Sequence, residues 1–280
     1  MMIRSLLAAL SLLAAAPACA HDWRFTCKGD EAHAHAEALQ WLREASASPT
    51  ARDADQAAGE KAYQAALALH AQLLAGKPVD PIYESSSHFL TLAAMAASDR
   101  TRTLFQRAAR DQLMRLDLQA LIERKAWAAG LSDNAAMYAF ALIGPESCGV
   151  DQENTAWLKA DLAKNGWFLI SRDGPDADNA AWLMAQHADQ DLPFQKQILA
   201  LIEPLVARHE SNPRNYAYIY DRVAVNQKLP QRYGTQGRCT EAGTWQPLET
   251  EAPGGLDARR ASVGLGPEAD YIALFHCQKG

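Results

Sequence analysis

Apolar residues recur with a helical period through the first half of the chain. Ala62, Ala66, Leu69 and Leu73 share one face of a segment that ends at Gly76. Similar spacing predicts further helices at 31–47, 85–97, 101–129 and 133–144. This half therefore reads as successive antiparallel helix pairs, and its many alanines favour helix further.

The second half keeps the helical pattern but is interrupted by turn residues. Its predicted helices lie at 151–165, 178–187, 193–204, 215–227 and 257–260, with a last one from Pro267. Two short runs, QRYGTQGRC and GTWQPLE, flank a turn and predict a small β-hairpin. The segment 144–151 reads as a loop, either a domain boundary or a tether inside one unit. The expected fold is mainly α: a helical N-terminal region, then an α-helical domain with a small β-hairpin.

The first twenty residues resemble a signal peptide. Arg4 supplies the positive charge, Leu6–Ala16 the short apolar run, and Ala18–Ala20 an A-x-A cleavage site. We expect cleavage after Ala20 and a periplasmic or secreted protein. The alternative is lipidation of Cys19, although the preceding residues lack the usual leucine of that motif.

Composition and charge restrict the partners. The chain has 280 residues, 49% of them hydrophobic and 21% charged, which is typical of a globular protein with a substantial core. Its net charge of −6 becomes −7 after removal of Arg4 with the signal peptide. No dense basic block occurs, so we expect neither nucleic acid nor an anionic membrane surface as partner. Beyond the signal sequence, no apolar stretch reaches the roughly 18 residues that a transmembrane helix needs.

Four cysteines remain after cleavage: Cys27, Cys148, Cys239 and Cys277. An even number in an exported protein predicts two disulfides, for which three connectivities exist. We favour Cys27–Cys148 and Cys239–Cys277, because each would then cross-link one half of the chain. No C-x-x-C motif occurs, so neither a thioredoxin-like nor a ribbon-type zinc role is indicated.

The first candidate for chemistry is QHAD at 186–189. If the helix ends before Pro193, the carboxylate of Asp189 can lie beside the imidazole of His187. A carboxylate bound to one ring nitrogen raises the basicity of the other, as a general base requires. The structural alternative is a buried histidine that bonds to a backbone carbonyl.

Asp221 and Arg222 are neighbours on a predicted helix. Their side chains diverge by about 100°, so each faces something different. Asp221 can point inward, while Arg222 can clamp a carboxylate of the protein or of a ligand. The alternative is an ion pair that braces the hairpin.

The segment 231–236, QRYGTQ, is the third candidate. Gln231 and Gln236 offer amide donors and acceptors for a neutral polar ligand, with Tyr233 between them. Gly234 allows a close backbone approach. Neither a phosphate-binding loop nor a G-x-S-x-G elbow is present, so no nucleotide cofactor and no serine hydrolase is indicated. The alternative is a β-bulge whose glutamines satisfy loop backbone.

A set of motifs resembles an uncharacterised bacterial family, one of the domains of unknown function. The motifs are RDQLMR (110–115), D-x-x-N (151–154), NGW (165–167), QHAD (186–189), Asp221-Arg222, Q-x-YGTQ (231–236) and D-x-R-R-x-x-x-GL (257–265). The resemblance covers roughly 105–275, so we expect an N-terminal region at 21–104 and a family domain at 105–280. Phe168 stands where the family usually has proline. The resemblance implies that these polar positions belong together, and it implies no substrate.

Two functions from different classes follow. In the first, the seven residues line a pocket with hydrolase- or lyase-like chemistry: His187 as acid/base, Asp189 or Asp221 orienting it, and Arg222, Gln231, Tyr233 and Gln236 holding a substrate. In the second, the chain is a non-catalytic envelope binding or protein-interaction module, and the same residues brace the fold. We expect no cofactor, and a small molecule or an envelope protein as partner. A metal site made by His187, Asp189 and Asp221 is a third, weaker option.

Overall fold

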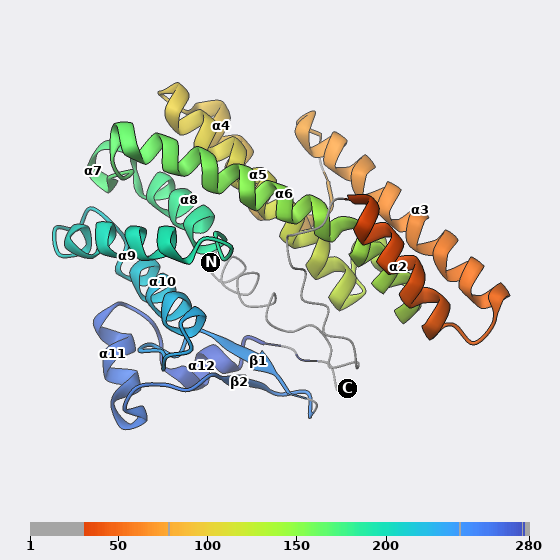
Figure 1. Cartoon of the computed structure of the whole chain (residues 1–280). Helices are drawn as coiled ribbons and strands as arrows, with labels where there is room; N and C mark the ends of the chain where they lie inside the picture. The colour runs from red at the N-terminus through yellow and green to blue at the C-terminus, as the bar shows by residue number, and fades with distance from the viewer. Residues whose placement is uncertain (1–30, 78, 241, 276, 278–280) are drawn as a thin grey trace. The chain divides into compact units, whose positions relative to one another are not determined.

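The computed structural model describes residues 31–77, 79–240, 242–275 and 277. This part of the chain is mainly α-helical and contains a two-stranded antiparallel sheet, as the sequence predicts (Figure 1). The predicted signal peptide and Cys27 lie outside the described residues.

Two compact units make up the described chain, an N-terminal unit (31–153) and a C-terminal unit (154–277). The division falls inside a long helix, α6 (Asp133–Asn165). The boundary expected at 105 lies within α5 (Asp99–Glu123), inside the N-terminal unit.

The N-terminal unit is built from paired helices. Its elements before α6 are α2 (Glu31–Ala45), α3 (Pro49–Leu74), η2 (Pro81–Tyr83), α4 (Glu84–Met95), α5 (Asp99–Glu123) and η3 (Ala126–Ala128). Helix α2 contacts α3, and α4 lies along α5 (Figure 1). Ser98 caps α5, because its Oγ accepts a hydrogen bond from the backbone N–H of Thr101 at 3.1 Å. The core joins Leu118 and Leu121 of α5 to Ala139 and Ile143 of α6, all at most 5% exposed.

The loop predicted at 144–151 is helical instead, which corrects the sequence analysis. Helix α6 runs through it and includes Pro145. Pro145 lacks the N–H that would bond to the preceding turn, so local propensity opposes helix here. Tertiary packing outweighs this preference: Ile143 and Val150 are each 1% exposed and belong to the core. Burial of these side chains holds the helix through a sequence that locally resembles a loop.

The C-terminal unit follows the second part of α6 with short helices and the hairpin. Its elements are α7 (Ile170–Asp173), α8 (Pro175–Gln186), α9 (Leu192–Val206), α10 (Pro213–Asn226), β1 (Gly237–Cys239), β2 (Trp245–Pro247), η4 (Pro253–Gly255), α11 (Leu256–Ser262) and α12 (Glu268–Ile272). Helices α8, α9 and α10 contact one another. Strand β1 pairs with β2 so that Cys239 faces Trp245. The predicted hairpin is confirmed.

A disulfide joins Cys239 on β1 to Cys277, with Cα atoms 5.5 Å apart. This is the pairing favoured from the sequence. Cys148 is also disulfide-bonded. Its pairing with Cys27 stays a prediction, because Cys27 is not among the described residues.

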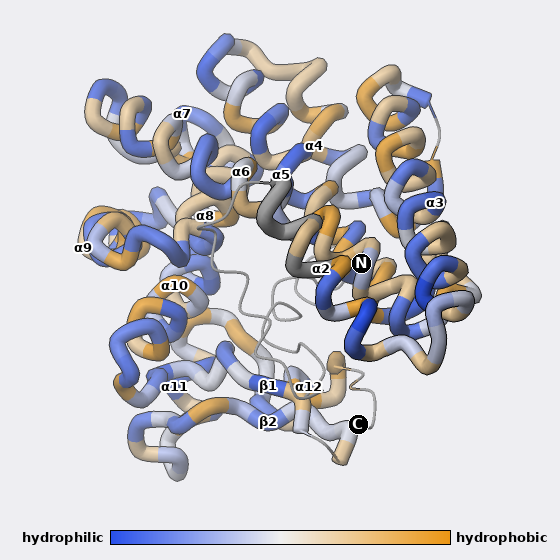
Figure 2. Tube along the Cα trace, turned by 45° about the vertical axis from the view of Figure 1, so that its right-hand side comes forward, coloured by the Kyte–Doolittle hydropathy of each residue, from blue (hydrophilic) through white to orange (hydrophobic). Residues whose placement is uncertain are grey.

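Polar and apolar residues alternate along the helices of both units (Figure 2). Consistent with this alternation, none of the described helices is long and apolar enough to cross a membrane.

Candidate functional site

The seven residues singled out from the sequence all lie in the C-terminal unit: at the end of α8 and in the turn after it, in the middle of α10, and in the segment before the hairpin. His187 ends α8, Asp189 lies in the turn to α9, and Asp221 and Arg222 are on α10. The other three, Gln231, Tyr233 and Gln236, belong to the segment between α10 and β1. The contacts of the six residues other than His187 form two groups, around Asp189 and Asp221.

The first group surrounds Asp189. Arg222 donates to both carboxylate oxygens, through Nε at 2.7 Å and through a second, shorter bond from Nη2. The amides of Gln195 and Asn226 donate to Oδ1 at 3.1 and 3.2 Å. Arg222 also approaches Oε1 of Gln236 at 3.5 Å. Asp189 thus ties the α8–α9 turn to α10 through a closed network.

Gln195 explains why the chain turns here. Its Nε2 donates to the carbonyl of Gln186 at 3.1 Å and to that of Ala185 at 3.3 Å. These carbonyls belong to the last turn of α8, which no further helical turn follows. A side chain from the first turn of α9 therefore caps α8 and also bonds to Asp189.

The environment of Asp189 keeps it ionised. Burial alone would raise its pKa, but the charge of Arg222 and the hydrogen bonds from Arg222, Gln195 and Asn226 outweigh this effect. The pKa of Asp189 consequently lies well below its usual range. The Asp189 side chain is still 44% exposed, so the Asp189–Arg222 ion pair adjoins solvent.

The second group is centred on Asp221, which is fully buried. Its Oδ1 accepts the backbone N–H of Arg232 at 2.7 Å and of Tyr233 at 3.0 Å. Its Oδ2 accepts the N–H and the hydroxyl of Thr235, both at 2.9 Å. Burial raises the pKa of Asp221, and the donated hydrogen bonds counter that shift. The Asp221 carboxylate thus accepts the backbone N–H groups of the 232–235 segment, as the carbonyls of a neighbouring strand would in a sheet.

Arg260 on α11 holds the carbonyls of the same segment. This arginine is 1% exposed. It donates from Nη1 to the carbonyl of Tyr233 and from Nε to that of Gly266, both at 2.7 Å. Its guanidinium also lies 5.0 Å from the ring centroid of Tyr271, a cation–π contact. Buried groups of opposite charge, Asp221 and Arg260, therefore hold the amides and the carbonyls of one segment.

Gln231 closes the segment on itself. Its Nε2 donates to the carbonyls of Gln236 at 2.7 Å and Leu248 at 2.9 Å, and its Oε1 accepts the N–H of Gln236 at 2.8 Å. Gly234, at φ +65°, makes the turn between them, and a Cβ there would lie 3.2 Å from Leu256. Most of the hydrogen-bonding capacity of the Gln231 amide is used inside the protein.

Tyr233 packs rather than points outward. It is 7% exposed, and its ring meets that of Tyr220 edge to face at 5.8 Å between centroids. Burial raises the pKa of its hydroxyl. The ring of Tyr233 thus packs against Tyr220 of α10, and its expected contact with a substrate stays a prediction.

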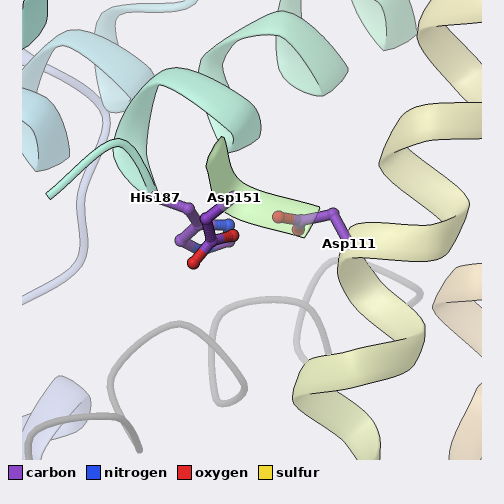
Figure 3. Close-up of side chains that lie close together, drawn as sticks. All are labelled: Asp111, Asp151 and His187. Carbon is purple, nitrogen blue, oxygen red and sulfur yellow. The ribbon is translucent and has the colours of Figure 1, made fainter. Parts of the chain in front are cut away.

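His187 ends α8 and is 2% exposed (Figure 3). Its backbone N–H donates to the carbonyl of Leu183 at 3.1 Å, which continues the helical pattern into the cap. The described contacts of Asp189 and Asp221 go to the donors given above. The orienting role expected for these two carboxylates therefore stays a prediction.

A family model matches residues 114–280, with the description "family of unknown function" (DUF6624). The chain belongs to the DUF6624 family. The match covers the whole C-terminal unit and agrees with the uncharacterised family expected from the sequence. No curated protein and no solved structure matches the chain.

Sequence reasoning missed one buried polar centre of the DUF6624 region, because it treated Asp178 only as the first residue of the predicted helix 178–187. Asp178 is fully buried and accepts hydrogen bonds from Nε1 of Trp167 at 2.7 Å and Oγ of Ser211 at 2.6 Å. The N–H of Asn212 and the amide of Asn215 donate to its other oxygen. Burial raises the pKa of Asp178, and these donors counter the shift. The NGW motif is thereby tied to α8, since Trp167 is its tryptophan.

A second missed cluster lies in the N-terminal unit around Asp117. His70 Nε2 and the hydroxyl of Tyr83 each bond to this carboxylate at 2.6 Å, and Nε1 of Trp127 donates to Tyr83 at 2.7 Å. Burial, and then the charge of Asp117, raise the pKa of Tyr83 far above its usual value. The cluster joins α3, η2, α5 and η3. The sequence offered no signal for it, because His70 and Asp117 are 47 positions apart.

Proposed function

We propose that this DUF6624 protein is an exported, non-catalytic binding or interaction module in which the polar signature residues brace the C-terminal unit. The observation that carries the proposal is the closed set of bonds around Asp221: three backbone N–H groups and one hydroxyl occupy its two oxygens. An orienting carboxylate needs a lone pair directed at the imidazole of the acid/base. The lone pairs of Asp221 are directed at its own chain.

The other residues of the set support the same function. Gln231 bonds to backbone on both sides of its amide. Asp189 is held by Arg222 and two amides. Polar groups that satisfy one another inside a unit stabilise a single conformation. We expect this rigid unit to present its surface to an envelope protein or a small molecule.

The disulfide bond supports export. A disulfide between Cys239 and Cys277 persists in oxidising compartments such as the periplasm or the medium. Expression in a bacterial host followed by mass determination tests this: we expect a chain that starts at His21 and is found outside the cytoplasm. Recovery of the uncleaved chain in the cytoplasm would count against export.

The brace is tested by comparing two glutamines. Gln231→Ala removes three internal hydrogen bonds, so we expect a loss of about 2–3 kcal/mol in the free energy of unfolding. Gln246→Ala, on the exposed side of β2, is the control and should change it by less than about 0.5 kcal/mol. A catalytic or ligand-holding residue behaves otherwise, because its replacement commonly leaves stability unchanged or improved. An unchanged or raised unfolding free energy for Gln231→Ala therefore contradicts the proposal.

The enzymatic alternative is favoured by one observation. The Asp189–Arg222 pair adjoins solvent, with 44% of the Asp189 side chain exposed, and Asp189 is two residues from His187. If His187 is the acid/base, His187→Ala abolishes a ligand effect or turnover and leaves the melting temperature within about 2 °C. A large fall in melting temperature without such a loss assigns His187 to the core.

A further inference from the structure

Two carboxylates on neighbouring helices of the N-terminal unit lie close together. Asp111 projects from α5 toward Asp151 on α6 (Figure 3). Oxygen atoms of the two lie within 4.8 Å of each other. Asp111 is fully buried, whereas the Asp151 side chain is 14% exposed. The pair therefore has one buried member and one that solvent reaches.

Arg115, one turn after Asp111 on α5, holds this arrangement in place. Its Nη2 donates to both oxygens of Asp151 at 2.8 and 3.0 Å, and its Nη1 lies 3.3 Å from Oδ1 of Asp111. A guanidinium in this position fixes the rotamer of each carboxylate. Positioned carboxylates on rigid helices are what a cation site requires.

Gln112 supplies an independent observation. Neighbouring residues on a helix point in different directions, yet Nε2 of Gln112 turns back to Oδ2 of Asp111 at 2.9 Å. Gln112 is 1% exposed, and its Oε1 is buried with no hydrogen-bond partner. An unsatisfied buried acceptor costs roughly 1–3 kcal/mol. The amide that bonds to the Asp111 carboxylate through Nε2 thus carries, on its other side, a buried oxygen without a hydrogen-bond partner.

The geometry fits a shared ion. Rotation of the Gln112 amide by half a turn exchanges Oε1 and Nε2 and places the oxygen about 3 Å from Oδ2 of Asp111. Two oxygens bound at right angles to one Mg²⁺ or Mn²⁺, at about 2.1 Å each, are also about 3 Å apart. The rotation would satisfy the unpartnered oxygen and complete a set of oxygen ligands.

We propose that Asp111, Gln112 and Asp151 bind a divalent cation of the oxygen-preferring class: Mg²⁺, Mn²⁺ or Ca²⁺. Carboxylate and amide oxygens suit these hard cations rather than copper or zinc, which favour nitrogen and sulfur. Water completes the coordination on the exposed side of Asp151. Arg115 acts as a positioning residue that fixes the Asp151 carboxylate through its two hydrogen bonds. The three proposed ligands belong to the N-terminal unit, and the proposal does not depend on the function proposed above.

Mn²⁺ titration of the chelator-treated full chain tests the proposal, with free Mn²⁺ followed by electron paramagnetic resonance. We expect about one Mn²⁺ per chain, competed by Mg²⁺ or Ca²⁺, and a rise of several degrees in melting temperature. Asp111→Asn, Gln112→Leu and Asp151→Asn should each weaken binding at least tenfold.

The matched controls are Asp99→Asn on α5 and Asp133→Asn on α6, whose side chains are 94% and 98% exposed. They should leave binding unchanged. Gln112→Leu keeps the test valid if an aspartate variant fails to fold, because it replaces a buried amide with an apolar group of similar size. No Mn²⁺ binding, or binding that survives these three substitutions, overturns the site. Stoichiometric binding of Zn²⁺ without Mn²⁺ overturns the assigned class of cation.

Discussion

Asp221→Asn is the sharpest perturbation of the C-terminal unit, because it preserves shape while changing hydrogen-bonding character. The carboxylate accepts N–H groups from Arg232, Tyr233 and Thr235 and the Thr235 hydroxyl, at 2.7 to 3.0 Å. In the variant, one acceptor oxygen becomes an NH₂ group that faces N–H donors. About half of the hydrogen bonds to residue 221 are then lost, and the N–H or hydroxyl groups that made them stay buried without an acceptor.

The magnitude follows from these contacts. A hydrogen bond to a charged group contributes about 1.5–3 kcal/mol, and such contributions are not additive within one network. Arg260 also loses the opposite charge on the far side of the 232–235 segment, and removal of one member of a buried charged arrangement costs about 3–5 kcal/mol. We therefore expect a loss of roughly 3 kcal/mol in the free energy of unfolding, or a melting temperature lower by about 6–12 °C.

The assay combines urea unfolding with hydrogen exchange. Amides 232, 233 and 235 should lose protection selectively, since they are the donors to Asp221. Asp270→Asn, at an exposed position of α12, is the control and should change neither quantity. A loss below about 1 kcal/mol with unchanged exchange at these amides would refute the bracing role of Asp221.

Two further predictions concern the same unit. Asp189→Asn should cost about 1 kcal/mol near neutral pH, because the Asp189 side chain is 44% exposed. The pKa of Asp189 is depressed in the folded state, so its stabilisation is complete above the unfolded value of about 3.9 and is lost as the pH falls toward the folded value. The gap in melting temperature between wild type and variant should thus shrink below about pH 4, and a gap that widens in acid contradicts the ion pair. Replacement of Cys239 and Cys277 by serine opens a loop with a sequence separation of 38 and should cost about 4 kcal/mol by chain entropy. Urea unfolding of the wild type with reductant should show a loss at least as large as in the double variant, because reductant also opens the disulfide of Cys148. A reduced wild type that is more stable than the double variant would point to another effect of the serines.

The sequence predicted much of the local structure. Helical periodicity located α3, and the turn composition near the C-terminus located the hairpin of β1 and β2. The even number of cysteines suggested the Cys239–Cys277 bond. These features depend on neighbours along the chain, or on a covalent bond with few alternatives. Where long-range packing opposed local preference, at Pro145 in α6, the prediction was wrong.

The polar positions show the same limit more clearly. Sequence motifs marked Asp221 and Gln231 as belonging together, and both do hold one segment. The motifs gave no indication of whether their polar atoms face a ligand or the protein itself. They also gave no signal for Asp178 as a centre of four donors, because those donors come from positions 11 to 37 residues away.

The sequence by itself determined a mainly helical chain with a small hairpin, a cysteine pair and a family of unknown function. Tertiary structure decided what the polar residues do. A carboxylate offers the same lone pairs to a substrate, a metal or a backbone amide, and only the packing of helices fixes which of these it meets. In the C-terminal unit the packing brings backbone amides to Asp221. In the N-terminal unit it brings Asp111 and Asp151 together and leaves an amide oxygen of Gln112 unpartnered.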